Sequence, residues 1–226
     1  MDFQAAVLIL LVSLGIFSFI SYRKRLLSFE GVLIANIVGI AIFLLGNSLV
    51  FFFTAVIFFV VAEFWTLFHM RRKARHEIRT AGNILGNSGT AILALALGFP
   101  FGFFAAFSGA LADTLSSEIG LLSKKKPLLI TTMKPVEPGT DGGVTLLGIS
   151  AAFLGGLIIA ALHLFLYRDI ILAAILVACG VFGSLADSIF GALFERQGML
   201  NNAEVNFLGS LSGTGLAWAI LVLAQI

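Results

Sequence analysis

Residues 144–166, VTLLGISAAFLGGLIIAALHLFL, form an apolar run without a charged residue. A helix of about 20 such residues is long enough to cross the hydrocarbon core of a bilayer. The rest of the chain has the same character, because 59% of its 226 residues are hydrophobic and 12% are charged, whereas about a quarter of the residues are charged in a soluble protein. The sequence therefore predicts an integral membrane protein and excludes a separate soluble catalytic domain.

Apolar runs bounded by charged or turn residues predict an all-α fold, a polytopic transmembrane helical bundle of about eight spans. The run from 84 to 99 is short, so seven spans is the alternative. We expect a single integral membrane domain, with N-terminal spans in residues 1–70 and a motif-bearing catalytic bundle in residues 71–226. The predicted spans are residues 3–21, 31–46, 48–68, 84–99, 101–122, 144–166, 170–194 and 205–226.

The positions of the basic residues predict the orientation in the membrane. If the first run is a retained helix, all of the 14 lysines and arginines except Arg168 fall on one side. Cytoplasmic loops are enriched in Lys and Arg, so we expect both termini outside and loops 71–79, 123–143 and 195–204 in the cytoplasm. The basic clusters at 23–25 and 124–126 are sufficiently explained by this topology and by contact with lipid headgroups.

Acidic residues inside the predicted spans are the first candidates for a functional site, because each costs about 2.5 to 3.5 kcal/mol to insert. Asp113 and Asp187 each follow a Leu-Ala step and lie on a stripe of small residues with a spacing of four. Such stripes face neighbouring helices, so both carboxylates should face the interior of the bundle. The similar segments NILG at 83–86 and NFLG at 206–209 suggest two related halves. The alternative is that the buried carboxylates only pair helices.

The longest polar stretch, TTMKPVEPGTDGG at 131–143, leads directly into a predicted span. Glycines before a helix allow backbone N–H groups to surround an anion at the helix N-terminus, and Lys134 can add a point charge. This pattern indicates a phosphate site, with a plain flexible connector as the alternative. Arg79, just before the short span, is a second phosphate candidate, although a role in topology explains it equally well.

The inventory of polar residues favours an oxygen-rich metal site. The chain has one cysteine and three scattered histidines, which argues against a zinc centre of the usual kind. Carboxylates and amides suit Mg²⁺, which is usually held by one or two carboxylates, waters and substrate phosphates. The sequence therefore predicts magnesium and phosphate chemistry at one face of the membrane.

Five segments resemble the membrane family of phytyl-phosphate kinase and transmembrane protein 19. The similarity runs from about residue 75 to the C-terminus, whereas the first three spans carry no comparable motif. The segments are RTAGNILGNSG (79–89), SGALADTLSSEIG (108–120), TTMKPVEPGTDGGVTLLG (131–148), GSLADSIFGALFERQG (183–198) and NNAEVNFLGSLSG (201–213).

The resemblance implies transfer of a phosphoryl group from a nucleoside triphosphate, with CTP a candidate donor, to an isoprenoid monophosphate of the phytyl or geranylgeranyl type. The product would be the prenyl diphosphate, and the cofactor would be Mg²⁺. The protein would be surrounded by membrane lipid, and no nucleic-acid partner is expected. We assign Asp113, Glu118 and Asp187 to metal and catalysis, and Lys134 to catalysis and phosphate. Further binding candidates are Arg79, Asn83, Asn87, Gly139, Thr140, Asp141, Gly142, Gly143, Glu195 and Asn206.

Two other functions use similar residues. A cytidylyltransferase acting on a lipid phosphate would need the same metal and substrate types. A secondary transporter also holds ions at intramembrane acids near broken helices, but the polar residues of this chain crowd one leaflet. Labelled nucleotide distinguishes the two enzymes, and neither product would form with a transporter.

Overall fold

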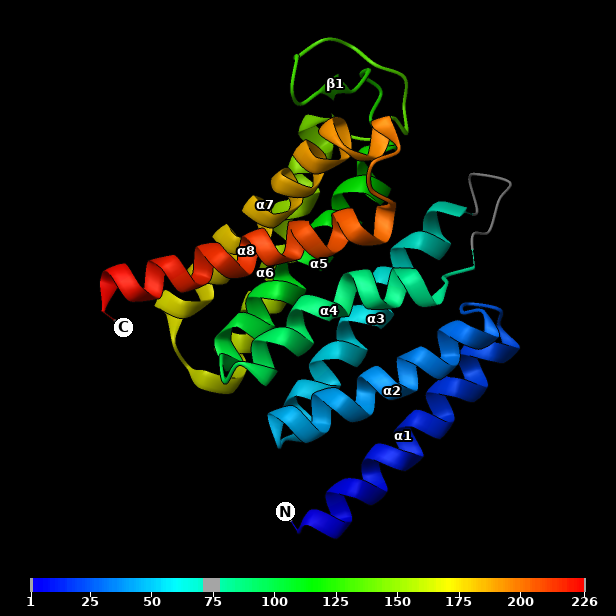
Figure 1. Cartoon of the computed structure of the whole chain (residues 1–226), viewed down its shortest axis with the longest axis vertical. Coiled ribbons are helices and arrows are strands. Elements are labelled where there is room, and N and C mark those ends of the chain that lie inside the picture. The colour runs from blue at the N-terminus through cyan, green and yellow to red at the C-terminus, as the bar shows by residue number, and fades with distance from the viewer. Residues whose placement is uncertain (1, 71–77, 226) are drawn as a thin grey trace.

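The computed structural model describes residues 2–70 and 78–225, which form eight α-helices (Figure 1). Six of these helices are long and apolar enough to cross a membrane, and α4 and α5 are the exceptions. The predicted all-α membrane bundle is therefore confirmed. The helices are α1 (Phe3–Arg23), α2 (Phe29–Gly46), α3 (Leu49–Met70), α4 (Ala81–Ala96), α5 (Pro100–Gly120), α6 (Leu146–Tyr167), α7 (Ile170–Leu193) and α8 (Asn202–Ala224).

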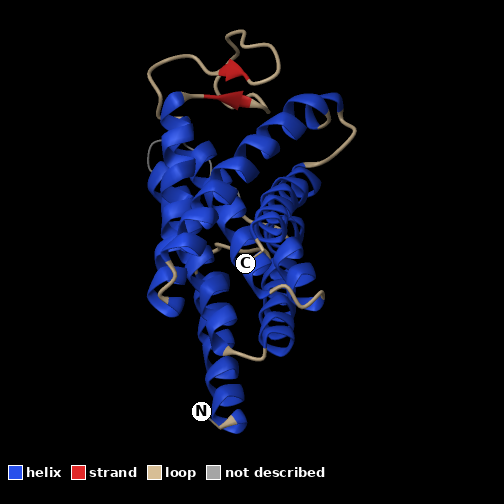
Figure 2. Cartoon of the chain, turned by 90° about the vertical axis from the view of Figure 1, so that its left-hand side faces the viewer, coloured by secondary structure: helices blue, strands red, loops and turns tan. Residues whose placement is uncertain are grey.

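Successive helices alternate in direction, and in Figure 1 the N-terminus lies at the bottom and the C-terminus at the left. The loops after α1, α5 and α7 lie at the opposite end, which we call the loop end. There the long loop between α5 and α6 holds a small antiparallel sheet of β1 (Leu128–Leu129) and β2 (Gly143–Val144) and projects beyond the helices (Figure 2). A short 3₁₀-helix, η1 (Glu195–Gln197), follows α7. Most of the predicted basic loop at 71–79 lies outside the described residues.

The centre of the bundle is α5, which packs against α3, α4, α6, α7 and α8. Every residue from 102 to 112 is buried, which fits a helix surrounded by protein. Small residues make this packing close: a Cβ on Gly155 of α6 would lie 2.6 Å from Ala112 Cα. The small-residue stripe that includes Asp113 therefore faces neighbouring helices, as its spacing predicts.

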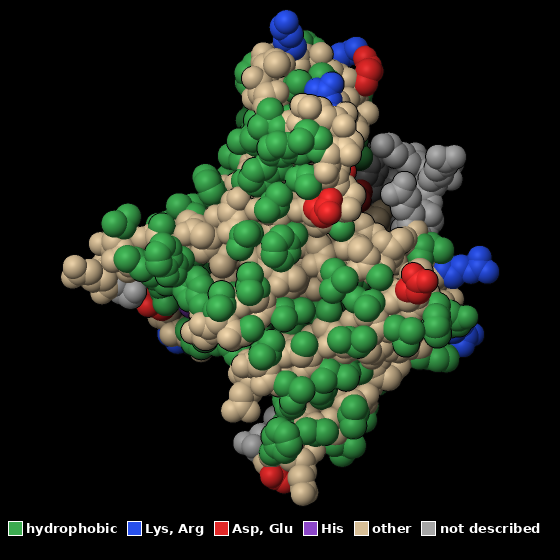
Figure 3. Space-filling view, in the orientation of Figure 1, with side chains coloured by type: hydrophobic (Ala, Val, Ile, Leu, Met, Phe, Trp, Pro, Cys, Tyr) green, Lys and Arg blue, Asp and Glu red, His purple; other side chains and the backbone are tan. Residues whose placement is uncertain are grey.

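The outer surface of the helices is apolar. Large side chains such as Leu8, Phe19 and Leu223 stay exposed, and apolar side chains cover the body of the molecule in Figure 3. Basic side chains in that view gather at the upper and right-hand edges. Lipid tails are the surroundings that suit such a surface.

Candidate active site

A polar cleft of about 870 Å³ opens at the loop end of the bundle. Its walls come from α3, α4, α5, α7 and α8 and from the loop that precedes α6. All but one of the residues predicted for the site line this cleft, and the exception is Lys134. Those that line it are Arg79, Asn83, Asn87, Asp113, Glu118, Gly139, Thr140, Asp141, Gly142, Gly143, Asp187, Glu195 and Asn206.

Asp113 and Asp187 form the innermost acidic pair of the cleft. Their helices meet at glycines, because a Cβ on Gly183 would lie 3.1 Å from Gly109 Cα. This approach brings the two carboxylates close enough to interact directly. The Ser184 hydroxyl lies 3.4 Å from Asp113 Oδ1 and donates a hydrogen bond to it. Two carboxylates so close repel each other unless a proton or cation lies between them.

Two amides accompany the aspartates. A small recess in the cleft floor is lined by Asn87 and Asn206 together with both aspartates. With its amide nitrogen turned to α7, Asn206 donates a hydrogen bond of 3.2 Å to Asp187 Oδ2. Only glycine at 209 lets α8 lie so near, since a Cβ there would be 2.8 Å from Asp187 Cβ. Asn87, which follows the first segment of the suggested repeat, lies by Asn206 at the start of the second segment, whereas Asn83 does not line this recess.

Arg79 is held at the edge of the cleft by α3. Its Nε forms an ion pair of 3.0 Å with Glu63 Oε2, and both side chains are largely buried. A second guanidinium nitrogen donates to Thr66 Oγ1 over 3.3 Å, and the Thr66 hydroxyl lies 3.3 Å from Glu118 Oε1. Asn83 stabilises the start of α4, because its Oδ1 accepts a hydrogen bond from the Thr80 backbone N–H.

Glu118 lies beside Thr66 and apart from the aspartate pair. Glu118 lies five residues after Asp113 on α5, which turns it to another side of the helix. Among residues 2–70 and 78–225, no group of three or more Asp, Glu, His or Cys side chains is placed to hold a metal ion. The structure therefore brings Asp113 and Asp187 together, whereas Glu118 lines another part of the cleft.

The glycine loop is docked against α7 rather than free. Gly139 and Gly142 have positive φ angles of 84° and 76°, a region that favours glycine. A Cβ on Gly142 would lie 2.4 Å from Ala192 Cβ and 2.7 Å from the Ser188 carbonyl oxygen. The N–H groups of Thr140 and Gly143 are used inside the loop, where they donate to the carbonyls of Glu137 and Thr140. Fewer backbone donors therefore face an anion than the glycine pattern suggests.

The structure places two of the lysines differently from what the sequence suggests. Lys134 is exposed on the turn between β1 and β2 and does not line the cleft, whereas Lys125 does. The neighbouring Lys126 makes an exposed ion pair of 2.7 Å with Glu137. No sequence signal distinguishes Lys125 within its triplet. Asn202, which also lines the cleft, has a detectable signal, because it lies one helical turn before Asn206.

Comparison with known proteins agrees with the motifs. A family described as "Integral membrane protein DUF92" matches residues 12–214. The membrane protein MJ0933 of Methanocaldococcus jannaschii is 36% identical over 202 residues, which cover 84% of each chain. Protein PGR of Arabidopsis thaliana is 37% identical over 50% of this chain and 43% of its own. Protein VTE6, chloroplastic, from the same plant is 36% identical over 53% of this chain and 37% of its own.

These matches confirm the resemblance to the family of phytyl-phosphate kinase and transmembrane protein 19. The match to VTE6 spans little more than a third of that protein. No solved structure matches the chain.

Proposed function

The chain belongs to the DUF92 family of integral membrane proteins, and we propose that it is a prenyl-phosphate kinase. It transfers a phosphoryl group from a nucleoside triphosphate, with CTP a candidate donor, to an isoprenoid monophosphate and releases the prenyl diphosphate. The observation that carries this proposal is the cleft itself. Paired aspartates, amides, an arginine and a lysine converge in a space of about 870 Å³ at one end of an apolar bundle.

The chemistry of this reaction fits the residues of the cleft. An oxygen of the acceptor phosphate attacks the γ-phosphorus of the donor, and the bond to the β–γ bridging oxygen breaks, so that the nucleoside diphosphate leaves with the electron pair. The acceptor is already an anion and needs no strong general base. Catalysis then consists of aligning two polyanions and stabilising charge. Among the described residues, Lys125 and Arg79 are the basic residues on the cleft wall that can do this.

The donor set fits Mg²⁺ through the two aspartates rather than through three carboxylates. Asp113 and Asp187 offer neighbouring oxygens, and the amides of Asn87 and Asn206 lie in the same recess. Mg²⁺ is usually held by one or two carboxylates and completes its shell with water and phosphate oxygens. When bound, it would neutralise the charge of the phosphates.

We also propose that the cleft faces the cytoplasm and that both termini lie outside. The loop after α1 and the long loop with the lysine triplet lie at the loop end of the bundle (Figure 1), and residues of this end line the cleft. Both loops are basic, and basic loops stay on the cytoplasmic side.

Nucleotide labelled at two positions tests the function. The purified full-length chain in lipid nanodiscs is incubated with Mg²⁺, farnesyl or geranylgeranyl phosphate, and CTP or ATP labelled at the α- or γ-phosphate. Label from the γ-phosphate in a prenyl diphosphate supports the proposal, and EDTA should abolish the reaction. Transfer of the α-label to the lipid would replace the proposal by cytidylyl transfer. Absence of any lipid product with all donors would refute both enzymes and favour a transporter.

A further inference from the structure

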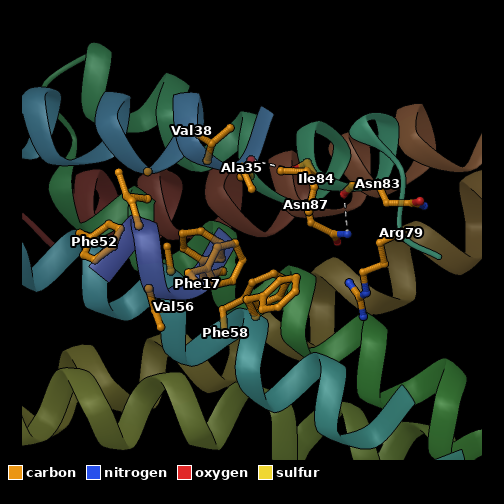
Figure 4. A pocket seen from close by; sticks show the side chains of 16 residues that line it. Phe17, Ala35, Val38, Phe52, Val56, Phe58, Arg79, Asn83, Ile84 and Asn87 are labelled. Atoms are coloured by element: carbon orange, nitrogen blue, oxygen red, sulfur yellow. Dashed lines mark hydrogen bonds between the residues drawn. The ribbon is translucent and has the colours of Figure 1, made fainter. Parts of the chain in front are cut away.

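A second cavity lies on the other side of Arg79 and is almost entirely apolar (Figure 4). It is enclosed by α1, α2, α3, α4 and α5, and its free volume is about 70 Å³. Phe17, Val38, Phe52 and Phe58 form its walls, and the last three are buried. Most of this lining comes from α1 to α3, which carry none of the five segments quoted above although the family match begins at residue 12.

The apolar cavity and the polar cleft share one wall. Arg79, Asn83 and Asn87 line both spaces. Figure 4 shows these three side chains at one end of the apolar cavity and Phe52 at the other. The polar end carries a guanidinium and two amides, which suit a phosphate, whereas the remainder suits hydrocarbon. A molecule that fits both spaces has a phosphate headgroup and an apolar tail.

We propose that the cavity between α1 and α5 binds the hydrocarbon tail of the acceptor and that α1 to α3 decide which tails are accepted. This inference rests on the proposed function for the identity of the headgroup. Along α3, the 14 residues from Phe52 to Thr66 at the cleft correspond to about 21 Å of helix. A free volume of about 70 Å³ is far below the roughly 300 to 1,000 Å³ of common ligand pockets, so the side chains that line the cavity must move to admit a long tail.

Such a cavity would orient the acceptor phosphate rather than increase the affinity for the prenyl tail. Lipid tails are as apolar as the cavity, so a prenyl tail gains little by leaving the membrane for it. A tail that is held beside Asn87 does fix the phosphate relative to the aspartate pair. Misplacement of reacting groups by about 1 Å can reduce the rate about a hundredfold. Filling the cavity should therefore slow turnover of acceptors whose tails no longer fit.

Two alanines that line the cavity allow a steric test. Ala35 on α2 and Ala55 on α3 are half-buried in its wall, and Ala41 on α2 is half-buried outside it. We expect Ala35→Leu and Ala55→Leu to lower kcat/KM for farnesyl phosphate by at least about tenfold. The value for dimethylallyl phosphate, which has one isoprene unit, and the KM for nucleotide should stay within about threefold. Ala41→Leu should leave all three values unchanged within the same factor. An equal loss with both acceptors, or no loss in either cavity variant, would overturn the proposal.

Photolabelling gives a readout that does not require turnover. The wild-type chain in nanodiscs is irradiated with a farnesyl phosphate analogue that carries a diazirine on its second isoprene unit, and the labelled peptides are mapped by mass spectrometry. Label near Phe17 or Phe58 that unmodified farnesyl phosphate displaces supports the tail site, even if no diphosphate is ever formed. Label spread over lipid-facing residues and not displaced would overturn it, even if the kinase activity is real.

Discussion

Gly142 offers a sharp test of whether the glycine loop must be seated on α7. An alanine Cβ at this position would lie 2.4 Å from Ala192 Cβ and 2.7 Å from the Ser188 carbonyl oxygen, whereas carbon atoms in contact are normally about 3.5 to 4.0 Å apart. The loop and α7 must then separate by about 1 Å. Gly139 is the matched control, because its φ angle is also positive but an added Cβ would have no neighbour within 4 Å.

Both substitutions place a side chain in the left-handed region, at about 1 to 2 kcal/mol, but only Gly142→Ala adds overpacking, at about 1 to 3 kcal/mol. We expect Gly142→Ala to lower kcat/KM for phosphoryl transfer about a hundredfold, since α7 also carries Asp187 and displacements of about 1 Å have effects of this size. Gly139→Ala should stay within about threefold of wild type. γ-Phosphate transfer measures the first effect, and thermal unfolding in nanodiscs should show a lower midpoint for Gly142→Ala than for Gly139→Ala. Equal activity and equal midpoints in the two variants would refute the reasoning.

Three further predictions address the metal, the lysines and the orientation. Asp113→Asn and Asp187→Asn should each abolish turnover while the protein remains folded, because the amide keeps the shape but loses the charge that holds Mg²⁺. Near-normal turnover in either variant would show that the substituted aspartate only pairs helices. Lys125→Ala should lower kcat/KM at least about tenfold, as expected for a cation that stabilises transferring phosphate. Lys134→Ala should change kcat/KM by less than about threefold, because an exposed charge is screened. If the γ-phosphate assay finds the opposite order, Lys134 rather than Lys125 contacts the phosphates. A cysteine at Thr140 in an otherwise cysteine-free chain should react with a membrane-impermeant maleimide only from the cytoplasmic side, and labelling of intact cells would contradict the proposed orientation.

The eight helices could be located from the sequence because their signal is local. A helix that crosses a membrane must satisfy its own backbone hydrogen bonds and present apolar side chains to lipid. A run of consecutive apolar residues therefore identifies it without knowledge of its neighbours. The small-residue stripes work in the same way: the spacing of four that carries Asp113 and Asp187 already places both on a packed face. The sequence predicted that both carboxylates face the interior of the bundle, and the structure places them in one cleft.

The sequence by itself thus determined the class of protein, the helices, and 13 of the residues that line the cleft. Only the tertiary structure decided how that set is divided. Glu118 is turned away from the aspartate pair and lies by Thr66, and Lys125 lies on the cleft wall where Lys134 does not. The apolar cavity beside Arg79 could not be predicted from the sequence, because its lining comes from five helices and most of the lining residues are apolar, as in any membrane helix. Such features depend on the angles at which helices pack and on the course of a loop, which are set by contacts between residues far apart in the chain.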